Sequence, residues 1–147
     1  MKKQALVIGY GNPLRGDDGL GWEVAGRLAA SIADPAVEIM SVQQLTPELS
    51  DPIHEASMVI FVDASTEGEP GTWRSTAVSP VANPAATLGH HMDVTALMAY
   101  TKAVYQTSPP AWLVSVTAET FACHDHLSSK VDAALPAVVR CIREKIA

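Results

Sequence analysis

Three short apolar runs constrain the fold of this chain more than any other feature. They are Ala5–Gly9, Met58–Val62 and Trp112–Val116. Each is rich in β-branched side chains and too short for a buried helix, so the pattern predicts three strands buried on both faces. Two weaker strands are predicted at Val37–Val42 and Thr72–Val78, the second as an edge strand with Trp73, Ser75 and Ala77 on one face.

Helical patterns lie between the predicted strands. Apolar residues recur at every fourth position from Leu20 to Ile32, which predicts an amphipathic helix. Three further helices are expected: a short one that starts at Thr46 and is interrupted by Pro52, one capped by Asp93, and a last one from about Ser129 that Pro136 kinks or delays.

The alternation of strands and helices predicts the fold class. It is typical of an α/β fold whose mainly parallel sheet is covered by helices on both faces. The chain has 147 residues and no repeat or linker, so a single domain over residues 1–147 is expected. Ligands of such folds bind outside the carboxyl ends of the strands.

Charge and cysteine content limit the function. The 16 acidic and 10 basic residues give a formal net charge of −6, which argues against a nucleic-acid or anionic-membrane partner. No apolar run reaches the ~18 residues of a membrane span, and the run behind Met1-Lys2-Lys3 is too short for a signal peptide. Cys123 and Cys141 form no CxxC motif, so a reducing cytoplasm is the expected location.

The turn after the first strand carries an aspartate pair, Asp17 and Asp18. A dinucleotide-binding loop needs glycine where Leu14 stands, and a P-loop needs lysine where Asp17 stands. Two carboxylates at a helix N-terminus would also repel phosphate. Because one aspartate suffices for capping, we expect one of the pair to cap the helix and the other to bind a cation.

Asp63 is the second candidate, because it directly follows the run Met58–Val62 at the carboxyl end of a buried strand. A carboxylate at such a place is costly unless it is paired or coordinated. A cap or a hydrogen bond to a neighbouring loop would also satisfy it. Its position at the ligand-binding edge of the sheet favours the functional interpretation.

The pair His90-His91, just before the helix capped by Asp93, gives a third candidate. Adjacent histidines are often only surface residues. If the loop that carries them packs on the same sheet, one of them meets Asp18 and Asp63 above the strand ends. Two carboxylates and one imidazole suit zinc, nickel or a similar divalent ion and leave positions open for another ligand.

The remaining histidines and cysteines give weaker signals. His124-Asp125-His126, next to Cys123, is a rival metal-binding cluster, although an exposed loop is the simpler interpretation and the one we favour. His54 is expected to be a surface or half-buried side chain and Cys141 a core residue. The sequence has no Gly-x-Ser-x-Gly elbow and no HExxH motif, so it lacks the common nucleophile and zincin signatures.

The sequence resembles the [NiFe]-hydrogenase maturation endopeptidases along nearly its whole length. The likeness starts with Gly-Tyr-Gly-Asn-Pro-Leu-Arg-Gly-Asp-Asp-Gly-Leu-Gly at residues 9–21. It continues through residues 44–49, 59–64, 89–93, 97–100, 119–121 and 127–128. The chain departs from the family at two places: many members have Asp-Gly where Ser41-Val42 stands, and many have glycine where His124 stands.

This resemblance implies a single three-layer α/β/α domain with a mainly parallel twisted sheet. It also implies a hydrolase, since family members remove a short C-terminal extension from the hydrogenase large-subunit precursor after nickel insertion. The resemblance assigns the metal-binding and catalytic residues to Asp18, Asp63 and His90. His90 is preferred to His91 because Asp93 then follows it by three residues, as is common in the family.

A mechanistic hypothesis follows from such a site. Three protein ligands leave open positions on a divalent cation, so the nickel of the precursor would be sensed directly and a nickel-free precursor rejected. The ion could also polarise the scissile carbonyl or activate a water molecule. The expected partner is thus the precursor, and the expected state a monomer. A non-catalytic nickel- or zinc-binding assembly factor is the main alternative; a nucleotide-binding module is disfavoured by the glycine spacing.

Overall fold

The computed structural model describes residues 2–80, 92–122 and 124–147. The helices and strands follow one another as β1 (Ala5–Tyr10), η1 (Gly16–Gly19), α1 (Leu20–Ser31), β2 (Val37–Val42), η2 (Pro47–Leu49), α2 (Ser50–His54), β3 (Val59–Ser65), β4 (Trp73–Val78), α4 (Val94–Tyr105), β5 (Ala111–Thr117) and α5 (Ser129–Ile146). Each predicted strand is thus confirmed, with small shifts at its ends.

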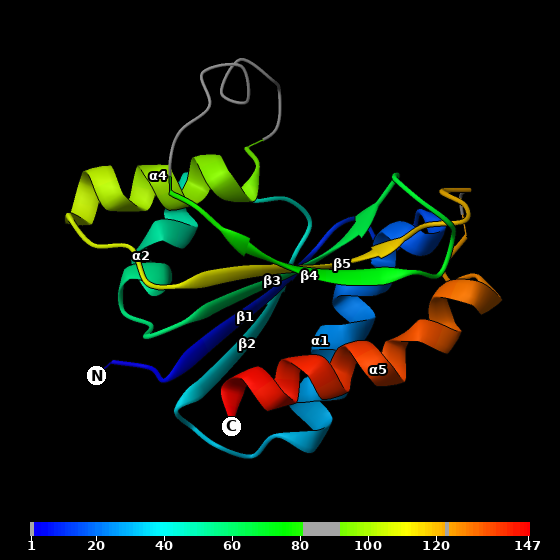
Figure 1. The fold of residues 1–147 in the computed structure, drawn as a ribbon, viewed down its shortest axis with the longest axis horizontal. Helices are drawn as coiled ribbons and strands as arrows, with labels where there is room; N and C mark the ends of the chain where they lie inside the picture. Colours follow the sequence, from blue (N-terminus) through cyan, green and yellow to red (C-terminus); the bar gives the residue numbers. More distant parts are fainter. Residues whose placement is uncertain (1, 81–91, 123) are drawn as a thin grey trace.

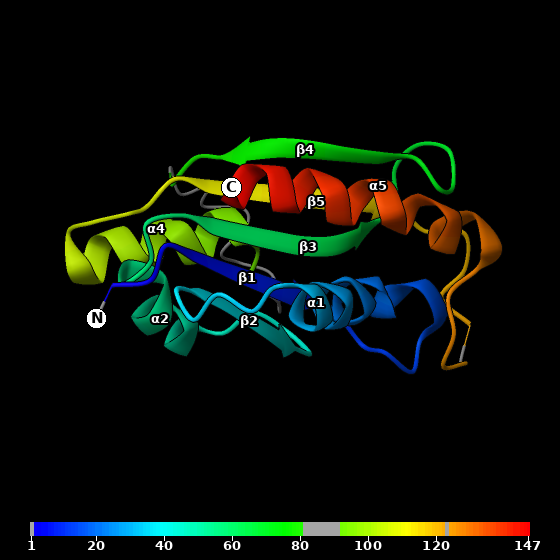
Figure 2. The same ribbon diagram turned by 90° about the horizontal axis from the view of Figure 1, so that it is seen from below.

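The strands form one sheet in the order β2-β1-β3-β5-β4, which Figure 2 shows. The first four strands in this order run parallel, and β4 pairs antiparallel with β5 at the edge. Figure 1 shows α2 and α4 on one face of the sheet and α1 and α5 on the other. The predicted three-layer α/β/α fold is confirmed.

The alternation of side chains along the strands divides the core between the two faces. Val7, Ile60 and Val62 point toward α1 and α5, whereas Ile8 and Phe61 point toward α2 and α4; all five are fully buried. Because helices cover both faces, the central strands need apolar side chains at every position, and this explains their continuous apolar runs.

The helix ends show how local sequence fixes the elements around the sheet. Asp93 accepts a hydrogen bond from the backbone N–H of Ala96 at 2.7 Å and so caps α4, as predicted. Ser128 caps α5 in the same way, and the helix continues through Pro136, so the late start at this proline is wrong. No helix in the described part of the chain is both long and apolar enough to cross a membrane.

Helix α1 packs unusually close to β1, and this contact needs glycine. A Cβ atom on Gly21 would lie 2.7 Å from both the backbone nitrogen of Tyr10 and the carbonyl oxygen of Val62, which is closer than a side-chain carbon can approach. The close contact holds the start of α1, and with it η1, over the carboxyl ends of β1 and β3. The turn with the aspartate pair is therefore placed at the ligand-binding edge of the sheet.

Candidate functional site

Asp18 and Asp63 line the same cavity at the carboxyl ends of the strands. The cavity has a volume of about 370 Å³. Its other lining residues are mostly polar and come from β1, the turn after it, the segment after β2 and the start of the α4 region: Tyr10, Gly11, Arg15, Gln43, Gln44, Leu45 and Met92. The two predicted carboxylates are 45 positions apart in the sequence, and the fold brings them together.

Asp63 reaches the cavity because of its register in the sheet. It is the first polar residue after the four fully buried residues of β3, and its side chain points to the α4 face, like that of Phe61 two positions earlier. Burial raises the pKa of Asp63 to about 7, and the charge of Asp18 adds to this rise, against hydrogen bonds from the Ala64 backbone and Tyr10. Near neutral pH both the protonated and the ionised form of Asp63 are therefore populated.

Tyr10 is a residue of this cavity that the sequence analysis did not single out. It is the last residue of β1, and since Gly9 pairs with Val62, the next step places it beside Asp63. Its hydroxyl group donates a hydrogen bond to the Asp63 carboxylate, and burial together with the neighbouring negative charge raises the pKa of Tyr10. The available signal was its position, since Tyr10 ends a buried strand as Asp63 does.

Asp18 is held by the turn between β1 and α1. Its Oδ2 atom accepts a hydrogen bond from the backbone N–H of Asn12 at 2.7 Å. The turn can fold back over Asp18 because Gly11 has a φ angle of +134°, where a side chain would be strained and a Cβ atom would also collide with the Asp18 carbonyl group. The rest of the carboxylate faces the cavity that Asp63 lines.

Asp17 has a different environment from its neighbour, since it is fully buried beneath the segment before α5. Its Oδ2 atom accepts hydrogen bonds from the N–H groups of Glu119 and Thr120, at 2.8 and 3.1 Å, and from the Ser128 hydroxyl at 2.8 Å. Its Oδ1 atom accepts the N–H of Ser128 at 2.7 Å. Burial alone would raise the pKa of Asp17, but these hydrogen bonds outweigh it and hold the pKa below its ordinary value.

The aspartate pair therefore corrects one expectation. Neither η1 nor α1 receives a side-chain capping bond, so neither Asp17 nor Asp18 caps the helix that follows it. Asp17 instead binds Ser128, the capping residue of α5, more than 100 positions later. The predicted cap is therefore wrong: Asp17 joins distant segments by accepting N–H groups of the 119–128 segment, and cation binding by Asp18 stays a prediction.

The third predicted ligand cannot be placed, since His90 and His91 lie outside the described residues, as does Cys123. In the rival cluster, the rings of His124 and His126 stack with their centroids 4.3 Å apart, and the side chains of Asp125 and His126 are mostly exposed. The exposed-loop interpretation is thus confirmed for Asp125 and His126, whereas His124 is half-buried and its Nδ1 atom is buried. Cys141 is half-buried and only partly a core residue.

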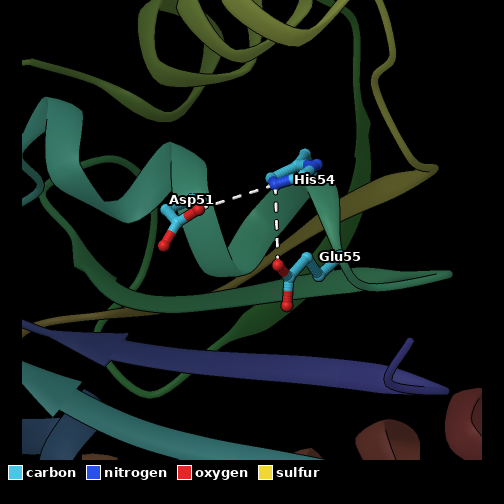
Figure 3. A group of neighbouring side chains, drawn as sticks. All are labelled: Asp51, His54 and Glu55. Carbon is cyan, nitrogen blue, oxygen red and sulfur yellow. Dashed lines mark ion pairs between the residues drawn. The ribbon is translucent and has the colours of Figure 1, made fainter. Parts of the chain in front are cut away.

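A second group of metal-type ligands lies at the other end of the sheet, on α2 and the residue after it (Figure 3). Within the described ranges, only one group of three such side chains has ligand atoms that all lie within 4.8 Å of one another: Asp51, His54 and Glu55. This spacing would fit a divalent metal. His54 Nε2 is 3.5 Å from Asp51 and 3.8 Å from Glu55. The half-buried position expected of His54 is confirmed.

Comparison with known proteins identifies the fold. No family model and no curated protein matches the sequence. Among solved structures, the maturation protease HycI of Thermococcus kodakarensis is 23% identical with a TM-score of 0.80, over 99% of this chain and 93% of that one. HybD of E. coli is 23% identical with a TM-score of 0.75, over 99% and 94%. The hydrogenase 2 maturation peptidase of a Thaumarchaeota archaeon is 24% identical with a TM-score of 0.76, over 98% of each chain.

The chain has the fold of the [NiFe]-hydrogenase maturation proteases. The likeness covers nearly the whole of each chain. The resemblance noted in the sequence motifs is thereby supported by an independent comparison of structures. At these identities the likeness establishes the fold, and the chemistry rests on the cavity lined by Asp18 and Asp63.

Proposed function

We propose that this chain is an endopeptidase that removes the C-terminal extension of a nickel-loaded [NiFe]-hydrogenase large-subunit precursor. Asp18, Asp63 and His90 recognise the nickel carried by the precursor. The single observation that supports this function is the cavity at the carboxyl end of the sheet, where Asp18 and Asp63 converge from separate elements in a chain with the maturation-protease fold.

The charges of the cavity suit this role. Burial and, to a smaller extent, the charge of Asp18 disfavour the ionised form of Asp63 when no cation is bound. A divalent ion offsets both effects and favours the ionised form, so a nickel-loaded precursor binds more favourably than a nickel-free one. The donor set of carboxylate oxygens and one imidazole also fits nickel, which accepts both ligand types.

The reaction needs a water molecule and a polarised carbonyl group at the same cavity. Nickel held by the substrate and by Asp18 would supply the Lewis acid. The ionised Asp63 carboxylate can accept a proton from the attacking water and return it to the leaving amine. The hydrogen bond from Tyr10 fixes the orientation of the Asp63 carboxylate for this proton transfer.

A processing assay tests the proposal. The protein is incubated with nickel-loaded and nickel-free large-subunit precursors from the same genome, and the products are weighed by mass spectrometry. We expect loss of a C-terminal peptide from the nickel-loaded precursor only. Cleavage of both forms would refute nickel recognition but not the endopeptidase. A stable complex without cleavage would refute the endopeptidase and favour the non-catalytic assembly factor.

A further inference from the structure

A row of five side chains crosses the whole sheet at the level of Asp63. The strand register pairs Val42 with Tyr10, Asp63 with Ser115, and Ser115 with Arg74, while Tyr10 lies beside Asp63. Side chains alternate along strands, so directly paired residues share a face, and this row lies on the α4 face. Asp63 stands in the middle of the row.

A second cavity lies on the other side of Asp63. Its volume is about 410 Å³, and it is lined by Asp63 itself and by residues of β5, β4 and the end of β3, among them Ser115, Arg74, Thr76 and Leu113. Asp63 also lines the first cavity, so the two cavities share this residue. Together they form a path across the strand ends, from Gln44 on one side to Arg74 on the other.

The dimensions and chemistry of the path suit an extended peptide. Five strands at a spacing of ~4.8 Å span roughly 19 Å, which matches about six residues of extended chain. The second cavity offers hydroxyl groups from Ser115 and Thr76, which can bind backbone groups of a peptide. Arg74, whose Nη2 atom donates a hydrogen bond to the Glu67 carbonyl oxygen at 3.0 Å, brings a positive charge to its rim.

We propose that the second cavity, between Asp63 and Arg74, holds the C-terminal extension of the precursor, on the far side of the bond that is cut. This inference rests on the proposed function. The nickel-bearing body of the precursor must lie on the side of Asp18, the other cation-facing carboxylate, and Asp18 lines only the first cavity. The chain that follows the scissile bond then continues past Asp63 over β5 and β4.

Photo-crosslinking tests this assignment. A benzoylphenylalanine residue is placed at Thr76, which lines the second cavity, or at Ala77, the next residue of β4, which is exposed on the opposite face. Each protein is irradiated with the nickel-loaded precursor, and the crosslinked peptides are identified by mass spectrometry. We expect position 76 to crosslink to residues of the extension and position 77 to give none. Crosslinks from position 76 to the precursor body, or no crosslink, would overturn the inference.

The same experiment separates this inference from the proposed function. Crosslinking to the extension without cleavage would reject the endopeptidase and keep the extension cavity. Cleavage without crosslinking from position 76 would keep the endopeptidase and reject the cavity assignment. Neither cleavage nor crosslinking would reject both.

A kinetic comparison adds a second readout. Thr76→Trp should fill the second cavity and raise the KM for the full-length extension at least tenfold, with little change for a precursor whose extension is cut back to one residue. Ala77→Trp adds the same bulk on the other face and should cleave both substrates like the wild type. An equal loss on both substrates with Thr76→Trp would mean that the site itself is distorted, and it would contradict the assignment.

Discussion

At the carboxyl end of the sheet, Asp18 and Asp63 come from two separate elements and line a cavity together. At the amino end, Asp51, His54 and Glu55 come from a single short helix and the residue after it. The donor types are similar, yet the surroundings differ. The side chains of Asp51 and Glu55 are 71% and 55% exposed, whereas burial shifts the pKa of Asp63 to about 7.

Donor chemistry alone therefore does not distinguish a functional site from a group of surface ion pairs. The side chains at the amino end already have partners within the protein. The His54 ring stacks on Tyr105 with centroids 3.7 Å apart, and the Tyr105 hydroxyl group donates a hydrogen bond to Asp51 at 3.4 Å. These contacts join α2 to α4 on the surface. The carboxyl-end group instead holds partly buried carboxylates close to each other, an unfavourable arrangement that a bound cation relieves.

The largest contrast is expected in processing. Asp18→Asn removes a ligand charge while its amide keeps the shape of the side chain, so cleavage of the nickel-loaded precursor should fall by roughly 10³-fold or more. The matched change Asp51→Asn, at the other end of the sheet, should leave the rate unchanged. Product masses measured over time give both rates. A normal cleavage rate with Asp18→Asn would show that the functional site does not lie at the carboxyl end of the sheet.

A second contrast concerns stability and separates the two adjacent aspartates. Asp17→Ala leaves several buried backbone donors without an acceptor, so we expect the free energy of unfolding to fall by at least ~3 kcal/mol. Asp18→Asn should change it by less than ~1 kcal/mol. Urea denaturation of the three proteins measures both values. Equal losses for the two variants would mean that Asp18 is structural as well.

The pH dependence of stability gives a smaller effect. Because the pKa of Asp63 is raised from 3.8 to about 7 in the folded chain, the folded state binds more protons than the unfolded state over this range. Stability contributed by protonated Asp63 is therefore lost as the pH rises through 7. Between pH 5 and pH 8 the wild type should lose about 1–2 kcal/mol relative to Asp63→Asn. A gap between the two unfolding curves that stays constant with pH would contradict the burial of this carboxyl group.

The smallest effect is expected at the amino end. A double-mutant cycle of Asp51→Asn and His54→Gln should give a coupling free energy below ~1 kcal/mol, since exposed ion pairs contribute little. Added nickel should raise the melting temperature of the His54→Gln variant as much as that of the wild type. If His54→Gln abolished this rise, the amino-end group would be a metal site. The two ends of the sheet would then not differ in the way proposed here.

Much of the fold could be predicted because buried parallel strands need apolar runs that are visible in the sequence. The run before Asp63 is an example, since its length fixes the strand and its end fixes the position of the carboxylate. The cap of α4 by Asp93 was equally visible, because the capping bond spans only three residues. Such features depend on neighbours in the sequence.

The roles within the aspartate pair could not be predicted in the same way. Asp17 turns inward because of N–H groups at residues 119, 120 and 128, and nothing near Asp17 in the sequence indicates these partners. The hydrogen bond between Tyr10 and Asp63 likewise follows from the pairing of β1 with β3. Both contacts depend on which strands and loops become neighbours.

The bond between Asp17 and Ser128 has a consequence for the order of synthesis. Residue 17 leaves the ribosome long before residue 128, 111 positions later. Until then the Asp17 carboxylate has none of its partners from the 119–128 segment. The contacts of Gly21 with β1 and β3, and of Asn12 with Asp18, lie within the first 62 residues and can form earlier. A nascent chain with β1, β2 and β3 complete can therefore place Asp18 while the neighbouring Asp17 still lacks its hydrogen-bond donors.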